Sequence, residues 1–363
     1  MPKFFKIIFA FFALFGTMVN STLDIKDGQI LNRFCDWMDK FNIESRDELH
    51  LVRIFDNWIS NDKYIEEINS MNLTYTIGHN SFSGMNSEEF SEYMGLIQNK
   101  EVFNKGLRGY ISNKLVEQSE IYDVSSLPSY LDWRDKGVVS GIRDQGQCGS
   151  CWSFSGTSTL ESSVAIKTGK LYDLSEQQGV DCSTIKQGFK NMGCNGGMYT
   201  NLWDFIESSQ GLCNESLYSY TSGTTTKTGT CQKTCTPISE TKVSSYVQVT
   251  PYSDNAMMSA LKINPVSIAI YAAGRSFQLY KSGIYDDYAG CGGSNPELDH
   301  AVVLVGYGSS NSQDYYILRN SWGTSWGNQD TIENNGYMLI SRGSNYGKAG
   351  MCGLLSEPYY PVV

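Results

Sequence analysis

The sequence of 363 residues has little positive charge, few histidines and no long hydrophobic run. Its formal net charge is −10 and it has no basic cluster, so neither nucleic acid nor an anionic membrane is expected as a partner. Histidine occurs only three times, at positions 50, 79 and 300, so few positions can supply an imidazole for catalysis. The apolar stretch at residues 7–19 is too short to span a bilayer with ease.

The N-terminus has the pattern of a secretory signal peptide, with a basic start before the apolar stretch. We predict that residues 1–20 are this signal peptide, with cleavage between about Gly16 and Thr22. A signal anchor is the alternative. The sequons at Asn72 and Asn214 also indicate the secretory pathway, with a lysosome, a vacuole or the cell exterior as the destination.

The cysteines agree with export. The chain has ten, and nine of them lie between Cys148 and Cys352, which is typical of a disulfide-bearing domain from an oxidising compartment. Nine is an odd number, so four bridges would leave one thiol, and such a thiol is a candidate for reactivity. Cys35 stands alone in the N-terminal part, and its state is left open.

Two regions of the chain differ in amino-acid composition. Residues 24–70 combine charged side chains with recurring Leu, Ile, Phe and Trp and contain no proline, which predicts long helices. From residue 127 onward Gly, Ser, Tyr and Cys become frequent, and the apolar runs at 266–270 and 301–305 are predicted to be buried strands. Residues 113–126 are interpreted as an extended linker between the two regions.

The strongest local motif is Gln-Gly-Gln-Cys-Gly-Ser-Cys-Trp at residues 145–152. A helix-like run over residues 157–167, which ends at Gly169, follows it, so the helix is expected to begin at Cys151. A thiol at a helix N-terminus is favoured as the thiolate, the form that attacks carbonyl carbon. The alternative is a bridged or inert buried cysteine.

His300 is the one histidine within the cysteine-rich region. The motif Leu-Asp-His-Ala-Val at residues 298–302 places it at the head of an apolar strand, and Asn-Ser-Trp-Gly follows at residues 320–323. The amide oxygen of Asn320 could accept the Nδ1–H of His300 and so hold the imidazole in one tautomer. The alternative is a histidine that is part of the core.

These three motifs, in this order and separation, resemble those of the papain and cathepsin L family of cysteine peptidases. The resemblance covers residues 127–363 and implies an α+β, two-lobed papain-like fold. One lobe would be mainly helical and carry Cys151, and the other would be a β-barrel carrying His300 and Asn320.

The resemblance also implies roles. Cys151 would be the nucleophile, His300 the general base and then acid, and Asn320 the residue that orients His300. Trp322 would shield that bond from water, and Gln145 would donate to the oxyanion together with the backbone N–H of Cys151. The implied reaction is peptide-bond hydrolysis through an acyl-enzyme, with neither a metal nor an organic cofactor.

The family comparison further implies a substrate-binding set and a disulfide pattern. The substrate-binding residues would be Gly196, Gly197, Met198, Tyr199, Ala269, Leu298, Asp299, Trp322 and Glu357. With Glu357 on the floor of an apolar slot, the pocket should accept both arginine and bulky apolar side chains, unless Glu357 lies on the surface. The implied disulfides are Cys148–Cys194, Cys182–Cys231, Cys291–Cys352 and an additional Cys213–Cys235, for which a reduced or rearranged state is the alternative.

Residues 21–126 resemble, more weakly, the inhibitory propeptide of cathepsin L-type precursors. Asn61, Ile65 and Asn69 match the end of its helical signature, with Trp58 in place of a phenylalanine and Arg53 one residue out of register. The stretch at residues 78–84 resembles its second motif, but Gly84 replaces the terminal aspartate, which leaves the pH trigger of activation open. A helix bundle with its own partner is the alternative.

The reading as a whole is a secreted or lysosomal zymogen whose propeptide is an intramolecular inhibitor. Endopeptidase action is expected because no second histidine lies beyond residue 127 and the 182–194 stretch is too short for a loop that captures chain ends. Protein and peptide substrates are the expected partners, cystatin-like inhibitors are possible, and a monomer is expected. A Thr/Gly-rich stretch at 221–230 and an insertion at 328–334 are predicted to be surface loops.

Two rival functions remain at this point. A non-catalytic secreted binding module could keep the same fold, but it would not need Cys151, His300 and Asn320 together. Alternatively, the N-terminal region could act as a free inhibitor of related peptidases once it is cut away.

Overall fold

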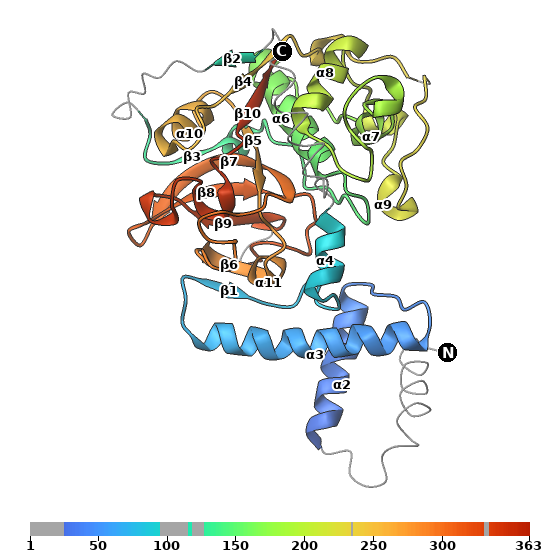
Figure 1. Ribbon diagram of the computed structural model, residues 1–363, viewed down its shortest axis with the longest axis vertical. Helices are drawn as coiled ribbons and strands as arrows, with labels where there is room; N and C mark the ends of the chain where they lie inside the picture. The colour runs from blue at the N-terminus through green and yellow to red at the C-terminus, as the bar shows by residue number, and fades with distance from the viewer. Residues whose placement is uncertain (1–24, 95–114, 118–126, 234, 330–333) are drawn as a thin grey trace.

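The computed structural model describes most of the chain, over residues 25–94, 115–117, 127–233, 235–329 and 334–363. The predicted signal peptide and most of the predicted linker lie outside the described residues. The described chain forms two lobes and an N-terminal helical part that lies below them in Figure 1.

Two long helices build the N-terminal part, which confirms the prediction for residues 24–70. They are α2 (Ile25–Lys40) and α3 (Glu48–Ser70), which cross each other in Figure 1. The carboxylate of Asp47 caps α3 by accepting the N–H of His50 at 2.8 Å. The helices share a small core formed by Phe34, Trp37, Met38, Leu51, Ile54 and Trp58.

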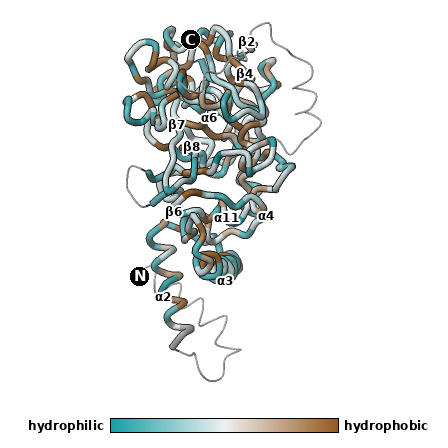
Figure 2. Tube along the Cα trace, turned by 90° about the vertical axis from the view of Figure 1, so that its left-hand side faces the viewer, coloured by the Kyte–Doolittle hydropathy of each residue, from teal (hydrophilic) through white to brown (hydrophobic). Residues whose placement is uncertain are grey.

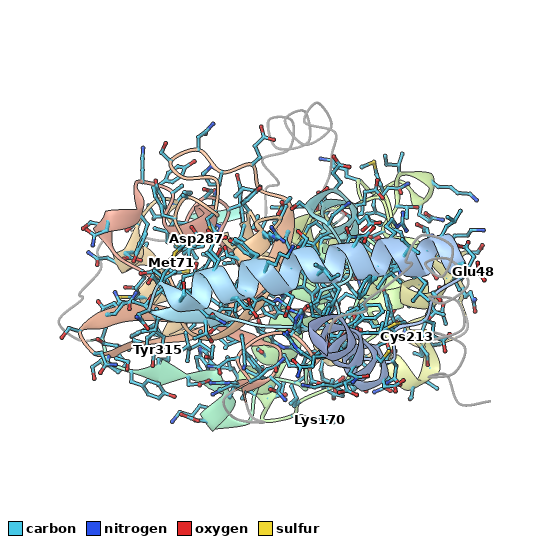
Figure 3. All side chains as sticks on the ribbon, turned by 90° about the horizontal axis from the view of Figure 1, so that it is seen from below. Glu48, Met71, Lys170, Cys213, Asp287 and Tyr315 are labelled. Atoms are coloured by element: carbon cyan, nitrogen blue, oxygen red, sulfur yellow. A yellow bond between two sulfur atoms is a disulfide. The ribbon has the colours of Figure 1, made fainter. Side chains whose placement is uncertain are left out.

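After α3 the chain attaches to the β-rich lobe and then turns between the lobes. Strand β1 (Tyr75–Ile77) pairs antiparallel with β6 (Tyr280–Tyr285), and helix α4 (Ser87–Met94) then rises toward the boundary between the lobes (Figure 1). Figure 3 shows α3 beneath both lobes, with Met71 on the side of Asp287 and Glu48 on the side of Cys213.

The helical lobe is organised around α6 (Cys151–Thr168), which begins at the predicted residue and ends at Gly169, whose φ is 75°. Its small side chains let neighbouring elements approach closely. Ser155 Oγ donates to the carbonyl of Val302 at 2.8 Å, so α6 is hydrogen-bonded to the other lobe. The remaining helices of this lobe are α7 (Glu176–Cys182), α8 (Tyr199–Ser209) and α9 (Ser222–Thr225).

The second lobe is a curled sheet with strand order β1-β6-β9-β8-β7-β5-β10-β4-β2, to which β3 is added beside β7. Both predicted buried strands are confirmed, as β5 (Val266–Ile270) and within β7 (His300–Ser310). The other strands are β2 (Leu115–Glu117), β3 (Leu131–Asp132), β4 (Ser245–Gln248), β8 (Gln313–Arg319), β9 (Tyr337–Ser341) and β10 (Tyr359–Val362), with helices α10 (Asp254–Leu261) and α11 (Arg275–Gln278). In Figure 2 the hydrophobic colour follows α6 and β7 through the interior.

Short 3₁₀-helices connect these elements. They are η2 (Trp133–Lys136), η3 (Ile185–Gln187), η4 (Glu215–Leu217), η5 (Ser239–Thr241), η7 (Ser344–Tyr346) and η8 (Met351–Gly353).

The predicted surface loop at residues 221–230 is exposed at most positions, but Ser222 within it is buried, and the predicted loop at residues 328–334 begins with a buried residue, Asn328. Ser222 is buried because its N–H donates to Gln177 Oε1 and its hydroxyl accepts from Gln177 Nε2. Asn328 is buried because its N–H donates to the carbonyl of Tyr337 at 2.7 Å. Residues 330–333 lie outside the described residues.

All four implied disulfides are present. They join Cys148 to Cys194, Cys182 to Cys231, Cys213 to Cys235 and Cys291 to Cys352. Cys35 and Cys151 are the two cysteines without a bridge, and both are buried. The open question about Cys35 is therefore answered for the described chain, in which it is an unpaired core residue of α2.

Candidate active site

The candidate nucleophile lies at the predicted helix N-terminus. Cys151 is the first residue of α6 and is fully buried. The backbone N–H groups of Cys151, Trp152 and Ala301 all interact with its sulfur in the sense that favours a thiolate. The first two are free amides of the helix N-terminus, and the third belongs to β7. The sulfur therefore lies where the helical lobe meets the first residues of β7.

His300 is the first residue of β7 and is fully buried. Its Nε2 lies 2.7 Å from Oδ1 of Asn320, whereas the sequence-based prediction used Nδ1, which is wrong. Asn320 follows β8 and reaches the tip of the ring rather than the nitrogen next to the backbone. Nδ1 is buried without a hydrogen-bond partner among the described residues, so it is the ring atom left to exchange a proton.

Trp322 covers one face of the imidazole. Its ring and that of His300 stack with centroids 4.6 Å apart and planes 24° apart, and Trp322 is fully buried. Two further aromatic rings of the β-rich lobe, Phe277 and Trp326, pack edge-on against Trp322. The imidazole of His300 therefore lies against a buried aromatic cluster, and the shielding of its bond to Asn320 by Trp322 stays a prediction.

Gln145 is fully buried and fixed at both ends of its amide. Nε2 donates to the carbonyl of Cys148 at 3.2 Å, and Oε1 accepts from the hydroxyl of Ser321 at 2.7 Å. A primary amide has two N–H hydrogens, so one remains for a substrate oxygen. Gln145 can therefore donate to an oxyanion from the loop that precedes Cys151.

Comparison with known proteins identifies the family. Residues 127–362 match the profile described as "Papain family cysteine protease". The chain belongs to the papain family of cysteine proteases. Residues 34–90 match a second profile, described as "Cathepsin propeptide inhibitor domain (I29)". The chain is therefore the precursor of a cysteine protease and includes an inhibitory propeptide.

Relatives and solved structures agree with this assignment. Cysteine proteinase RD21A of Arabidopsis thaliana is 35% identical over 95% of this chain and 69% of its own length. Cysteine proteinase 3 of Dictyostelium discoideum is 34% identical over 98% of both chains. The structure of a recombinant stem bromelain precursor superposes with a TM-score of 0.76, at 33% identity, over 92% of this chain and 99% of its own. The predicted two-lobed fold with a helical propeptide is confirmed.

The propeptide of the protease reaches the candidate nucleophile. The carbonyl oxygen of Met94, the last residue of α4, lies 3.6 Å from the sulfur of Cys151. Phe82 and Phe90 pack on Trp322 with centroid distances of 5.5 and 5.3 Å. The same propeptide segment therefore covers the sulfur and the tryptophan beside His300.

Burial determines the protonation of the pair in the precursor. It raises the pKa of the Cys151 thiol to about 12, although the helix N–H groups oppose the shift. Burial also lowers the pKa of His300 to about 4, against the effect of the Asn320 hydrogen bond. Both shifts favour the uncharged forms, so burial under the propeptide disfavours a thiolate–imidazolium pair in the precursor. The carbonyl of Met94 accepts a hydrogen bond from a thiol and would repel a thiolate.

The implied substrate pocket is partly assembled. Met198, Tyr199 and Ala269 are buried, and the hydroxyl of Tyr199 donates to the carbonyl of Glu357. β5 and β10 pair Ser267 with Tyr359, so the start of β10, two residues after Glu357, lies beside β5. Burial raises the pKa of the Glu357 carboxyl to about 7, which places it in a desolvated setting rather than on the surface.

The remaining residues of the implied pocket have structural partners. Gly197 packs on Trp152, because a Cβ there would lie 2.7 Å from its ring, and Gly196 needs glycine for its φ of 106°. The carboxylate of Asp299 accepts the N–H groups of Ala272 and Ala273, which fixes the chain after β5. Leu298 packs near Gly353.

Two contacts of the site carry no signal in the sequence. The carbonyl of Met94 belongs to no motif, and its approach to Cys151 depends on how α4 is placed. The hydroxyl of Tyr220 binds the loop before Cys151, yet nothing local marks this residue among the 23 tyrosines of the chain. Within the described residues no helix is long and apolar enough to cross a membrane.

Proposed function

We propose that the mature protease is an endopeptidase in which Cys151 is the nucleophile and His300 exchanges the proton. The observation that carries the proposal is the position of the Cys151 sulfur among the N–H groups of α6 and Ala301, the residue that follows His300. The hydrogen bond from His300 to Asn320 leaves Nδ1 as the proton-exchanging atom. Such an arrangement activates a thiol for attack on a carbonyl carbon.

The reaction follows from these roles. The Cys151 thiolate attacks the carbonyl carbon of the scissile bond, and the C–N bond breaks as imidazolium His300 gives its proton to the leaving amine. Water then adds to the thioester while His300 takes one of its protons, and the C–S bond breaks to release the acid. Through both steps Asn320 holds the imidazole in one orientation and Trp322 excludes water from their hydrogen bond.

The oxyanion of each tetrahedral intermediate would be bound by two donors. One is the free N–H of Gln145 Nε2, and the other is the backbone N–H of Cys151. Gln145 supports this role because Ser321 fixes its amide and because its side chain is buried.

Residues 21–126 would be the propeptide and residues 127–363 the mature enzyme, after removal of a signal peptide at residues 1–20. Maturation would cut between about Ser119 and Leu127, just before the segment that the protease profile matches. Edman sequencing of the mature form tests this boundary, and a first residue before Ser112 or after Trp133 would contradict it.

The same proposal covers substrate choice. Endopeptidase action is supported by the single histidine beyond residue 127 and by the short 182–194 stretch. The hydrogen bond from Tyr199 to the carbonyl of Glu357 supports a pocket beside Glu357 that accepts arginine as well as bulky apolar residues. Early release of dipeptides from a blocked protein would contradict endopeptidase action.

The secretory pathway is the proposed route, with a lysosome, a vacuole or the exterior as destination. Four disulfides support an oxidising compartment. Asn72 is exposed and open to glycosylation, whereas Asn214 is only partly exposed. A monomeric state and inhibition by cystatin-like proteins stay predictions.

An epoxide that traps active-site thiolates tests the proposed function. The full precursor should be labelled poorly at neutral pH and strongly after acidification and maturation, with the label on Cys151. Cys151→Ala should abolish both labelling and hydrolysis, while Cys35→Ala should change neither. Hydrolysis by Cys151→Ala would refute the proposal, and a fully inert wild-type protein would favour a binding module.

A further inference from the structure

We infer that Tyr220 is a positioning residue for the oxyanion hole, an inference that rests on the proposed roles of Gln145 and Cys151. Its hydroxyl lies 2.7 Å from the main-chain carbonyl oxygen of Gln145 and 2.7 Å from the hydroxyl of Ser150. Gln145 carries one proposed donor on its side chain. Ser150 precedes the other, because the N–H of Cys151 belongs to the peptide bond between Ser150 and Cys151.

Counting hydrogens fixes the direction of this bridge. A carbonyl oxygen can only accept, so the single hydrogen of the Tyr220 hydroxyl goes to Gln145. The tyrosine oxygen then accepts from the hydroxyl of Ser150, whose other acceptor, the carbonyl of Cys148, is farther away at 3.3 Å. The result is a directed chain, Ser150 to Tyr220 to Gln145, in which each hydrogen bond strengthens the next. The phenol thereby spans the loop that carries both donors and sets the distance between its two ends.

The phenol ring is itself held firmly in place. It packs edge-on against Phe154 of α6 with ring centroids 4.9 Å apart, and its backbone N–H donates to Glu215 Oε1 at 2.7 Å. Burial raises the pKa of the Tyr220 hydroxyl well above its usual value, so the group is a neutral donor at any working pH. The side chain therefore acts as a rigid spacer rather than as a titrating group.

The chain beyond Tyr220 docks on the same loop. The N–H of Gln147 donates to the carbonyl of Gly223 at 2.9 Å. Gly223 also touches Gln145, because a Cβ on it would lie 2.8 Å from the carbonyl oxygen of Gln145. The segment from Tyr220 to Gly223 thus contacts the main chain of the loop, whereas Ser321 holds the side-chain amide of Gln145.

Tyr220→Phe tests the inference, with the full precursor matured in trans by a removable trace of wild-type enzyme. Loss of the hydroxyl should lower kcat for a peptide amide about 10-fold, with KM changed less than about two-fold, because the donors serve the transition state. Reaction of Cys151 with a dipyridyl disulfide forms no oxyanion. Its rate and pH profile should stay at wild-type values.

Tyr218→Phe is the matched control. The hydroxyl of this neighbouring tyrosine donates to Asp181 at 3.0 Å and not to the loop before Cys151. Its removal should leave kcat within about two-fold, whereas an equal loss in both variants would overturn the inference. A fall in the disulfide reaction that matches the fall in kcat would also overturn it, because the damage would then lie in the thiol–imidazole pair.

A double-mutant cycle gives a second test. Ser150→Ala removes the other end of the chain, so its effect should be less than additive with that of Tyr220→Phe. Full additivity would show that the two hydroxyls act independently and would contradict a connected bridge. Activity in Cys151→Ala would refute the proposed function itself, which separates that failure from a failure of the Tyr220 inference.

Discussion

Four disulfides hold the protease part together, whereas the propeptide is held by packing and hydrogen bonds. The propeptide has one cysteine, Cys35, which is unpaired, and its own core is the small cluster around Trp58. It docks through β1 on β6 and through amide contacts such as Asn80 Nδ2 to the carbonyl of Gln278 at 2.7 Å. One part is thus built to persist in an oxidising compartment, and the other can leave once the chain is cut.

The charged side chains of the two parts also differ in their surroundings. In the propeptide, the carboxylate of Asp62 lies between the half-exposed Arg33 and the ring of His79, next to the segment that docks on the protease. In the protease part, Arg143 pairs with Glu176, which is almost fully buried and helps to join α7 to the loop before Cys151. A charge cluster near a docking segment can respond to pH, whereas a buried one mainly fixes geometry.

The largest expected effect belongs to the protease part. Gln145→Ala should lower kcat by about 10²–10³-fold, because one oxyanion donor is lost. Latency of the precursor should not change, since Gln145 is bound to Cys148 and Ser321 within the protease. Active-site titration and steady-state kinetics on the mature form check the first statement. Activity of the Gln145→Ala precursor before maturation would contradict the view that latency depends on the propeptide and not on Gln145.

A substitution in the propeptide should alter the release of the propeptide from the protease and leave the turnover of the mature enzyme unchanged. His79 stacks on Trp58 at 4.6 Å, and its Nε2 lies 3.0 Å from Asp62. Burial, with a smaller contribution from Arg33, lowers the pKa of His79 below its usual value of 6.5, against the effect of Asp62. The docked propeptide thus prefers the neutral ring. Acidification below about pH 6.5 therefore stabilises the released form, in which the ring can take a proton.

His79→Gln should consequently slow activation of the precursor at pH 5 by about 10-fold and leave kcat of the mature enzyme unchanged. The pH dependence of epoxide labelling measures this. His50→Gln is the comparison variant. The pKa of His50 is also lowered, mainly by burial, but its ring is bound to the N–H of Arg46 just before α3 and not to Asp62, so a smaller effect on activation is expected. Residue 84 cannot act as a pH trigger of activation, because it is a glycine and not the aspartate of the family motif. The site has no room for a larger residue, since a Cβ on Gly84 would lie 2.8 Å from Ile54. Unchanged activation of His79→Gln would exclude this histidine.

A substitution in the substrate pocket should alter only the choice of substrate. Glu357→Gln should reduce the preference for arginine over phenylalanine by about five-fold at pH 8, since a partly exposed ion pair is lost. In the wild type, acceptance of arginine should rise with pH through about 7, where the buried carboxyl ionises. Paired kinetics with Phe-Arg and Arg-Arg coumarin amides measure both effects. A Gln variant with wild-type Arg-Arg turnover would remove Glu357 from the pocket.

The smallest effect is expected from the insertion. Deletion of residues 330–333, with Asn328 and Asn334 kept, should change turnover of small substrates less than about two-fold, because short surface deletions between anchored ends are tolerated. Asn328 is kept because it bonds to Tyr337, and Asn334 because it accepts from Arg134. Loss of folding, seen as failure to mature, would show that this segment belongs to the protease core.

Much of the site could be predicted because its residues lie in short local motifs. The start of α6 at Cys151 follows from the glycines before it and the helix-forming run after it, and β7 follows from an apolar run that begins at His300. The bond from His300 to Asn320 was predicted through the wrong nitrogen, because which ring atom faces Asn320 depends on how β7 and β8 pair. Ser222 and Asn328 were misplaced because polar residues were expected to be exposed.

The sequence by itself determined the family, since the motifs around Cys151, His300 and Asn320 carry it in residue type and spacing. The pairing of the eight bridged cysteines was implied by that resemblance, because spacing alone leaves the connectivity open. Only the tertiary structure decided how buried Cys151 and His300 are and which distant residues contact them. The carbonyl of residue 94 is brought against the sulfur of Cys151, and the loop from Gln145 to Ser150 is spanned by a tyrosine from residue 220. Such contacts join positions far apart in the chain, and burial, which shifts both pKa values, exists only once those positions meet.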